Sequence, residues 1–181
     1  MSQRRTFITA MAGALLVFFA VHFMDFQGSV PRFKEVSQGG ALLDVSPSFS
    51  VDEIYRRISD YGEAGRRSYS FRNVTVDVLL PLSLLPFLLL LMLKAVNPLK
   101  LSRSSQALLL SFPVVYVVFD LAENTVVLIL LAHFPERMDK LAAILPYVTS
   151  VKRLGSLLAI FVPLGILGVR FLGSKLRRQR A

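Results

Sequence analysis

The sequence contains neither cysteine nor tryptophan and only two histidines. Without cysteine the chain has no disulfide framework, no thiolate metal site and no thiol nucleophile. Without tryptophan, anchoring at a membrane–water interface has to depend on tyrosine, phenylalanine, lysine and arginine. The sequence also has no metal-ligand spacing, phosphate-binding loop or Ser-His-Asp order, so we expect no metal and no cofactor.

Apolar residues are abundant instead, and they occur in four long runs. They make up 54% of the 181 residues, and the mean hydropathy is +0.56. A helix needs roughly 20 apolar residues to cross the hydrocarbon core of a bilayer. The runs predict spans at about 7–24, 75–93, 108–132 and 152–172. Residues 1–181 are therefore expected to form one membrane domain, an all-α, antiparallel four-helix transmembrane bundle.

The first run follows Arg4 and Arg5, a pattern that is similar to a twin-arginine export signal. A cleaved signal needs a site with small residues after the apolar core. Here the core is followed by His22-Phe23-Met24-Asp25, so we expect the run to be retained as a membrane span. Cleavage at this point is the alternative.

The distribution of charge predicts the orientation of the chain. The net charge is +9, but the basic residues stand at the ends of apolar runs and are not interleaved with aromatic residues, so we expect no nucleic-acid binding. Lysine and arginine close to a span resist translocation. Both termini and the 94–105 link are therefore expected to be cytoplasmic. They carry ten basic residues and no acid: Arg4, Arg5, Lys94, Lys100, Arg103, Arg170, Lys175, Arg177, Arg178 and Arg180. The basic C-terminal tail either serves only as a topology signal or also binds anionic lipid.

Residues 26–73 form the predicted outer loop, in which acids and bases are nearly balanced. Glycine and proline are frequent between Gly28 and Pro47, which predicts an irregular first half. Ser50 and Glu53 then form a capping-box pattern that predicts a short amphipathic helix at about 51–61. We expect residues 26–63 to cover the outer end of the bundle as a cap.

Ionisable and polar residues within the spans are expected to form a cluster. On the third span, helical spacing places four polar residues on one face. On the second span, one polar stripe forms if the helix is continuous from Ala64; it comprises Arg66, Tyr69, Ser70, Asn73 and Asp77. An antiparallel hairpin of spans three and four, turning near 136–137, places Asp120 level with Arg153 and Glu123 close to Ser150. We therefore expect the carboxylates of the spans to lie against Arg66, Lys152 and Arg153. The candidate cluster comprises Arg66, Tyr69, Asp77, Tyr116, Asp120, Glu123, Asn124, Lys152 and Arg153.

This cluster has two interpretations. In the first, its ion pairs only fix the register of the helices. In the second, it is a polar pocket open to the outside, because ionisable groups inside a membrane mark functional sites. Both remain open on the sequence alone.

Three short motifs resemble a group of small, uncharacterised bacterial four-span membrane proteins. They are the run Tyr61-Gly62-Glu63-Ala64-Gly65-Arg66-Arg67-Ser68-Tyr69, then Asp77 with Pro81, and then Asp120-Leu121-Ala122-Glu123-Asn124. The resemblance covers the chain from about Val51. It implies a four-helix architecture in a bacterial inner membrane and does not indicate what the protein does.

We therefore predict a multi-pass membrane protein without enzymatic activity. Its polar cluster and cap are expected to bind a lipid, a small ligand or a partner, which includes a membrane subunit or a second copy of the chain. The alternative is an intramembrane enzyme or proton-coupled transporter that uses Asp77, Asp120 and Glu123.

Overall fold

The computed structural model describes residues 3–179 and the side chains of residues 4–175. This part of the chain is helical and contains no strand. The elements in chain order are α1 (Gln3–Phe23), α2 (Val30–Val36), α3 (Val51–Asp60), α4 (Gly62–Val74), α5 (Val76–Val96), the short 3₁₀ helix η1 (Asn97–Leu99), α6 (Arg103–His133) and α7 (Asp139–Gln179).

Four helical segments of the described chain are long and apolar enough to cross a membrane. They are 4–23, 62–99, 103–133 and 139–175. Since lipid cannot satisfy backbone hydrogen-bonding groups, helical segments of this length suit a membrane interior. The predicted all-α four-helix bundle is confirmed.

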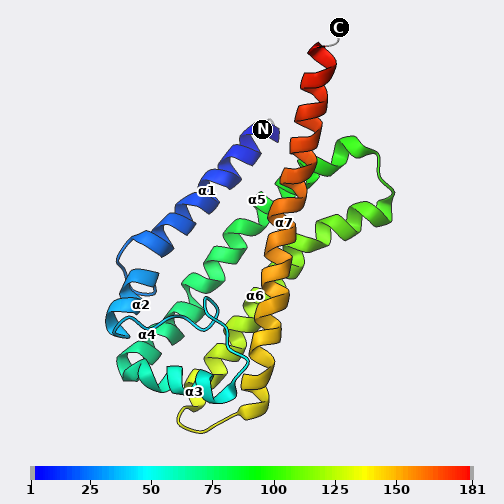
Figure 1. Ribbon diagram of the computed structural model, residues 1–181. Coiled ribbons are helices and arrows are strands. Elements are labelled where there is room, and N and C mark those ends of the chain that lie inside the picture. The colour runs from blue at the N-terminus through cyan, green and yellow to red at the C-terminus, as the bar shows by residue number, and fades with distance from the viewer. Residues whose placement is uncertain (1–2, 180–181) are drawn as a thin grey trace.

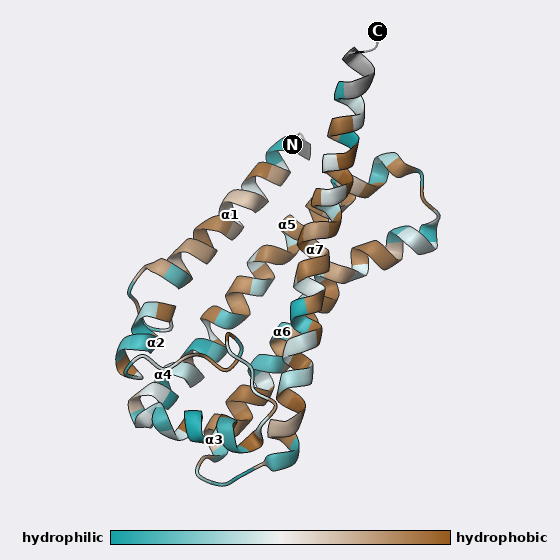
Figure 2. Ribbon diagram, in the orientation of Figure 1, coloured by the Kyte–Doolittle hydropathy of each residue, from teal (hydrophilic) through white to brown (hydrophobic). Residues whose placement is uncertain are grey.

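Helix α5 occupies the centre of the bundle and packs against α1, α6 and α7. Helices α6 and α7 form an antiparallel hairpin. Figure 1 shows that α1 begins and α7 ends at the same end of the bundle, while the cap and the α6–α7 turn lie at the other end. Apolar residues cover the long helices, and polar residues concentrate in the cap and in a zone of the bundle next to it (Figure 2).

Two apolar clusters hold the molecule together. One lies under the cap, where Phe33 and Ile58 pack against Leu130 and other residues near the α6–α7 turn. The other lies within the bundle and joins α5, α6 and α7. There a Cβ on Gly155 would lie 3.0 Å from the backbone nitrogen of Tyr116, so α6 and α7 approach closely because this position has no side chain.

The first half of the outer loop is more regular than the sequence predicted. Residues Val30–Val36 form the helix α2, whose N-terminus is capped by Ser29, and Pro31 occupies one of its first positions. Proline fits there because the first amide groups of a helix have no helical acceptor. The predicted helix at 51–61 is found as α3, and Ser50 accepts a hydrogen bond from the amide of Glu53.

The condition for the predicted polar stripe on the second span is not met, because the helix is not continuous from Ala64. The helix begins at Gly62 but is interrupted at Thr75, whose φ of −121° and ψ of −82° are not helical. The Thr75 hydroxyl donates to the carbonyl of Phe71 at 2.6 Å, which satisfies a backbone group freed by the interruption. Helix α5 therefore starts with its side chains turned relative to those of α4.

Candidate functional site

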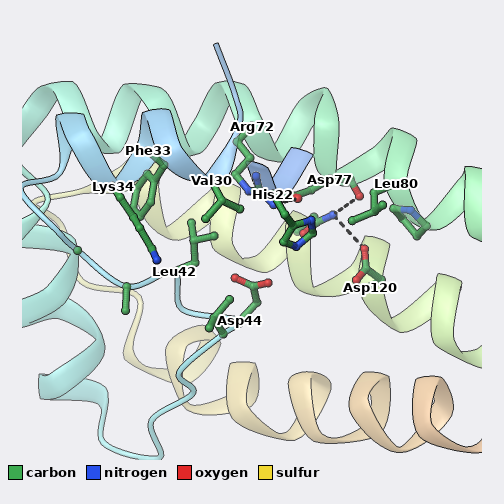
Figure 3. A pocket seen from close by; sticks show the side chains of 15 residues that line it. His22, Val30, Phe33, Lys34, Leu42, Asp44, Arg72, Asp77, Leu80 and Asp120 are labelled. Carbon is green, nitrogen blue, oxygen red and sulfur yellow. Dashed lines mark hydrogen bonds and ion pairs between the residues drawn. The ribbon is translucent and has the colours of Figure 1, made fainter. Parts of the chain in front are cut away.

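A cavity of about 310 Å³ lies between the cap and the long helices α1, α5 and α6. Figure 3 shows His22, Arg72, Asp77 and Asp120 on its wall, with Asp44 approaching from the cap. The residues that line it are His22, Val30, Phe33, Lys34, Gly40, Ala41, Leu42, Asp44, Val45, Arg72, Asp77, Leu80, Pro81, Asp120 and Asn124.

Next to this cavity, Glu123 of α6 is held by two side chains of α7. Its relative exposure is 0%. Thr149 donates a hydrogen bond to one carboxylate oxygen, and the Lys152 ammonium forms an ion pair with the other. Burial of a carboxylate without such partners would cost several kcal/mol. This contact therefore fixes α6 against α7 and leaves Glu123 no access to the cavity.

Lys152 also faces two carboxylates that do line the cavity. Its Nζ is 3.5 Å from an Asp120 oxygen and 3.8 Å from an Asp44 oxygen. The side chains of Asp120 and Asp44 are 14% and 27% exposed, compared with 1% for Glu123. One buried cation thus serves three carboxylates, of which two remain accessible from the cavity.

A second ion pair forms the wall of the cavity at the α4–α5 junction. An Arg72 guanidinium nitrogen lies 2.6 Å from an Asp77 oxygen. Another donates at 2.9 Å to the carbonyl of Gly28. Gly28 has a φ of +94°, and a Cβ there would lie 2.7 Å from a Val76 side-chain atom, so only glycine fits this approach. The pair joins the start of the cap to the second long helix.

Asn124 completes the junction between α5 and α6. Its side-chain nitrogen donates at 3.0 Å to the backbone carbonyl of Asp77 and lies 3.5 Å from an Asp120 oxygen. The helical partner of that carbonyl would be the amide of residue 81, but Pro81 has no N–H. Asn73 in turn donates at 3.3 Å to the backbone carbonyl of Asn124. The two amides therefore bridge the helices at the interruption.

The segment 41–46, which carries Asp44, has no regular helix but is anchored by side chains of the surrounding helices. Arg57 donates to the carbonyls of residues 41, 42 and 46. Tyr61 also donates to the carbonyl of residue 41, at 2.6 Å, and burial raises the pKa of this phenol to about 12. The hydroxyl of Tyr69 accepts from the amide of residue 43 at 3.0 Å. Arg153 donates to the carbonyls of residues 44 and 45 at 2.8 and 2.9 Å.

The structure brings together five of the nine candidate residues around the cavity and its buried ion pair: Asp77, Asp120, Glu123, Asn124 and Lys152. Tyr69 and Arg153 lie beside them and hold the Asp44 segment by its backbone. Tyr116 is 9% exposed and belongs to the apolar cluster of the bundle.

The expectation that Arg66 and Arg153 pair with the carboxylates of the spans was wrong. The Arg66 guanidinium lies over the Phe134 ring at 4.4 Å and donates to the carbonyl of Ile58 at 3.3 Å. It therefore connects the cap to the α6–α7 turn. Arg153 is exposed and uses its guanidinium for backbone carbonyls of the cap. The cations that meet the carboxylates are Lys152 and Arg72.

Sequence reasoning missed Asp44, Arg72 and Thr149. Arg72 is a cation at the start of the apolar run and close to Asp77 in sequence, which was a usable signal. Thr149 stands one turn before Lys152 on the same helix face, which also could have been noticed. Asp44 lies in an irregular segment, and no periodicity in the sequence places it against the spans.

The site carries more negative than positive charge. Counted without His22 and Lys34, which also line the cavity, it holds the four carboxylates of Asp44, Asp77, Asp120 and Glu123 and the two buried cations of Arg72 and Lys152, a formal difference of two negative charges. The exposed Lys34 lies at the rim, where water screens its charge. Uncompensated charge is costly in a low-dielectric surrounding, so a cationic group or protons bound at these carboxylates would lower that cost.

Apart from His22 of α1, the remainder of the cavity wall is apolar. Val30, Phe33 and Leu42 contribute from the cap, and Leu80 and Pro81 contribute from α5. Within residues 3–179, no group of three histidine or acidic residues is arranged to hold a metal ion. The cavity therefore places charged and apolar side chains on one wall.

A scan against protein-family models finds no match to the chain. Searches of the curated proteins and of the solved structures also find no match.

Proposed function

We propose that this multi-pass membrane protein binds a small cationic amphiphile, such as an amine-bearing lipid or a membrane-soluble amine, in the cavity beneath the cap. Its ammonium group would lie among Asp44, Asp77 and Asp120, and its apolar part would contact Leu80 and Pro81. The volume of about 310 Å³ is at the small end of ligand sites and suits a head group or a small amine.

The observation that carries this proposal is the surplus of carboxylates on a wall that also holds apolar side chains of the cap and of α5. Asp44 and Asp120 share Lys152 with the buried Glu123, so neither has a cation of its own. An ammonium group between them would supply the missing charge and replace the water lost on burial. An anionic ligand would instead meet repulsion from both.

Binding is favoured over the alternative of proton-coupled transport or intramembrane catalysis. Both would need carboxylates that are free to exchange protons. Glu123 is enclosed by Thr149 and Lys152, and Asp77 is paired with Arg72 at 2.6 Å, so of the three residues of that alternative Asp120 is left for proton exchange from the cavity. Acidification of the interior of liposomes that contain the protein, driven by an outside proton gradient and absent in empty liposomes, would favour the transporter.

The proposal includes an orientation for the protein. The cap would face the outside of a bacterial inner membrane, and both termini would be cytoplasmic. The distribution of charge supports this orientation, because both termini and the 94–105 link contain lysine and arginine but no acidic residue. Arg177, Arg178 and Arg180 of the basic tail lie outside the residues whose side chains the structure describes. A second copy or another membrane subunit remains a proposed partner.

Titration with three probes of equal chain length tests the function. Decylammonium, decanol and decanoate would be added to the purified full-length protein in an uncharged detergent, and binding would be followed by calorimetry. Titration of the detergent alone corrects for partition of each probe into micelles.

We expect saturable binding of decylammonium. Decanol should bind at least about tenfold more weakly, which corresponds to about 1.4 kcal/mol for the lost charge interaction. Decanoate should not bind. Equal binding of all three probes, or preferential binding of decanoate, would contradict the proposal.

A further inference from the structure

A second hollow lies at the other end of the bundle, between the first turns of α1 and the last turns of α5. Its volume is about 530 Å³. It is lined by Arg4, Thr6, Phe7, Leu90, Leu93, Lys94 and Asn97. This end carries the start of α1 and the end of α7, and the cavity under the cap lies at the opposite end (Figure 1). The two sites are therefore independent.

The polar rim of this hollow is positively charged. Arg4 and Lys94 are exposed, and within the described part of the chain neither forms an ion pair with an acid. All twelve acids of the sequence lie between Asp25 and Asp139, and none lies between residues 78 and 119. The hollow therefore has no nearby negative charge of the chain to offset its two cations.

One of these cations is positioned by an aromatic ring. The Lys94 ammonium lies 4.8 Å from the centre of the Phe7 ring. That ring packs at 5.6 Å, between centroids, against Phe87 of α5. A cation over an aromatic face is attracted to the ring and keeps its N–H groups available to an anion. Lys94 is thus held across the α1–α5 contact at the edge of the hollow.

The wall of the hollow that α5 forms below its basic rim, toward the middle of the bundle, is apolar. Leu90 and Leu93 are half-buried and continue into the apolar length of α5. On α1, Leu15 and Leu16 are 60% and 71% exposed, as expected of side chains that face lipid. The cationic rim thus lies at the end of two apolar helices, the level at which a bilayer presents its head groups.

We propose that this hollow binds an anionic phospholipid. Its phosphate would lie between Arg4 and Lys94, Thr6 and Asn97 would hydrogen-bond to the head group, and an acyl chain would follow Leu90 and Leu93. Charge attracts the head group, and the apolar wall separates a lipid from a free anion. Lys100 and Arg103 are basic residues of the same end, but they do not line the hollow.

Thermal unfolding of the full-length protein in an uncharged detergent tests this site. The additives would be dioleoyl phosphatidylglycerol, dioleoyl phosphatidylcholine and inorganic phosphate, each over a concentration series. The site variant is Arg4→Gln with Lys94→Gln. The matched control is Lys100→Gln with Arg103→Gln, which removes the same charge from the same end. Lys94→Gln alone is measured in case the double variant does not fold.

We expect phosphatidylglycerol to raise the Tm of the wild type more than phosphatidylcholine does. The site variant, and to a smaller extent Lys94→Gln alone, should need at least about tenfold more phosphatidylglycerol for half of the shift, whereas the control should need less than about threefold more. Equal losses in site and control variants would show diffuse attraction to charge and overturn the proposal. Equal stabilisation by inorganic phosphate would overturn the lipid as the ligand, and equal stabilisation by phosphatidylcholine would overturn its charge selectivity.

Discussion

The side-chain amide of Asn124 donates to the backbone carbonyl of Asp77 at 3.0 Å. It replaces the helical donor of that carbonyl, because residue 81 is a proline and has no N–H. The bond joins α6 to the first turn of α5 and sets one corner of the cavity. In a membrane interior such a carbonyl has no water to bond. Asn124 therefore has a structural role beside the three cavity aspartates.

A double-mutant cycle measures this contact. Asn124→Ala should lower the free energy of unfolding by about 0.6–2 kcal/mol, because the Asp77 carbonyl loses its donor. In a Pro81→Ala background the amide of residue 81 can bond that carbonyl, so the same change should cost less. Reversible unfolding in mixed detergents gives both values. Equal losses in the two backgrounds would contradict the assignment.

The fold and the level at which α6 meets α7 were largely predictable, because both follow from local periodicity and from counting along a hairpin. The α6–α7 turn lies between His133 and Asp139, around the predicted 136–137. Counting from that turn placed Glu123 beside Ser150, and the structure pairs it with the adjacent Thr149 and with Lys152. Hydrophobic runs and helix length were sufficient for this level of description.

The cavity itself was not predictable, because it depends on contacts between residues far apart in the sequence. Asp44 lies in an irregular segment, and its place is set by Arg57, Tyr61, Tyr69 and Arg153 from three other helices. Periodicity says nothing about a segment of this kind.

The Arg72–Asp77 pair was also not predictable, because it depends on the interruption of the helix at Thr75. In a continuous α-helix, residues five apart are separated by about 140° around the axis. The sequence prediction therefore placed Arg66, rather than Arg72, on the face of Asp77. The changed direction of the chain at Thr75 allows Arg72 to reach Asp77.

The buried ion pair on α7 predicts a large loss of stability when its cation is removed. Lys152→Met should lower the free energy of unfolding by about 3–5 kcal/mol, because it leaves Glu123 charged and enclosed. Combining it with Glu123→Gln should recover part of the loss. Lys140→Met, an exposed position on the same helix, is the control and should change stability by less than about 0.5 kcal/mol. A similar loss in both lysine variants would argue against a buried pair.

The close approach of α6 and α7 predicts opposite effects of two glycine substitutions on one helix. Gly155→Ala should lower the free energy of unfolding by about 1–3 kcal/mol, because its Cβ would meet the backbone of Tyr116. Gly165 has open space around it, so Gly165→Ala should be neutral or stabilise by up to about 1 kcal/mol through helix propensity. Thermal unfolding in one detergent compares them. A stabilising Gly155→Ala would mean that the helices are not in contact here.

The proposed orientation can be tested with single cysteines, since the chain has none of its own. Ser59→Cys lies on an exposed position of α3, and Ser104→Cys lies on an exposed position at the start of α6. A maleimide that does not cross membranes should label the first in intact bacterial spheroplasts and the second only after permeabilisation, because the basic end is retained inside. The reverse pattern would place the cap in the cytoplasm.

The central claim is that the aspartates of the cavity, rather than acidic residues in general, bind a cation. The most direct measurement is the affinity for decylammonium of Asp44→Asn, Asp120→Asn and the control Asp60→Asn, an exposed position on α3. Each cavity variant should bind decylammonium at least about tenfold more weakly than the wild type, and the control should bind it like the wild type. Unchanged affinity in both cavity variants, or an equal loss in all three, would contradict it.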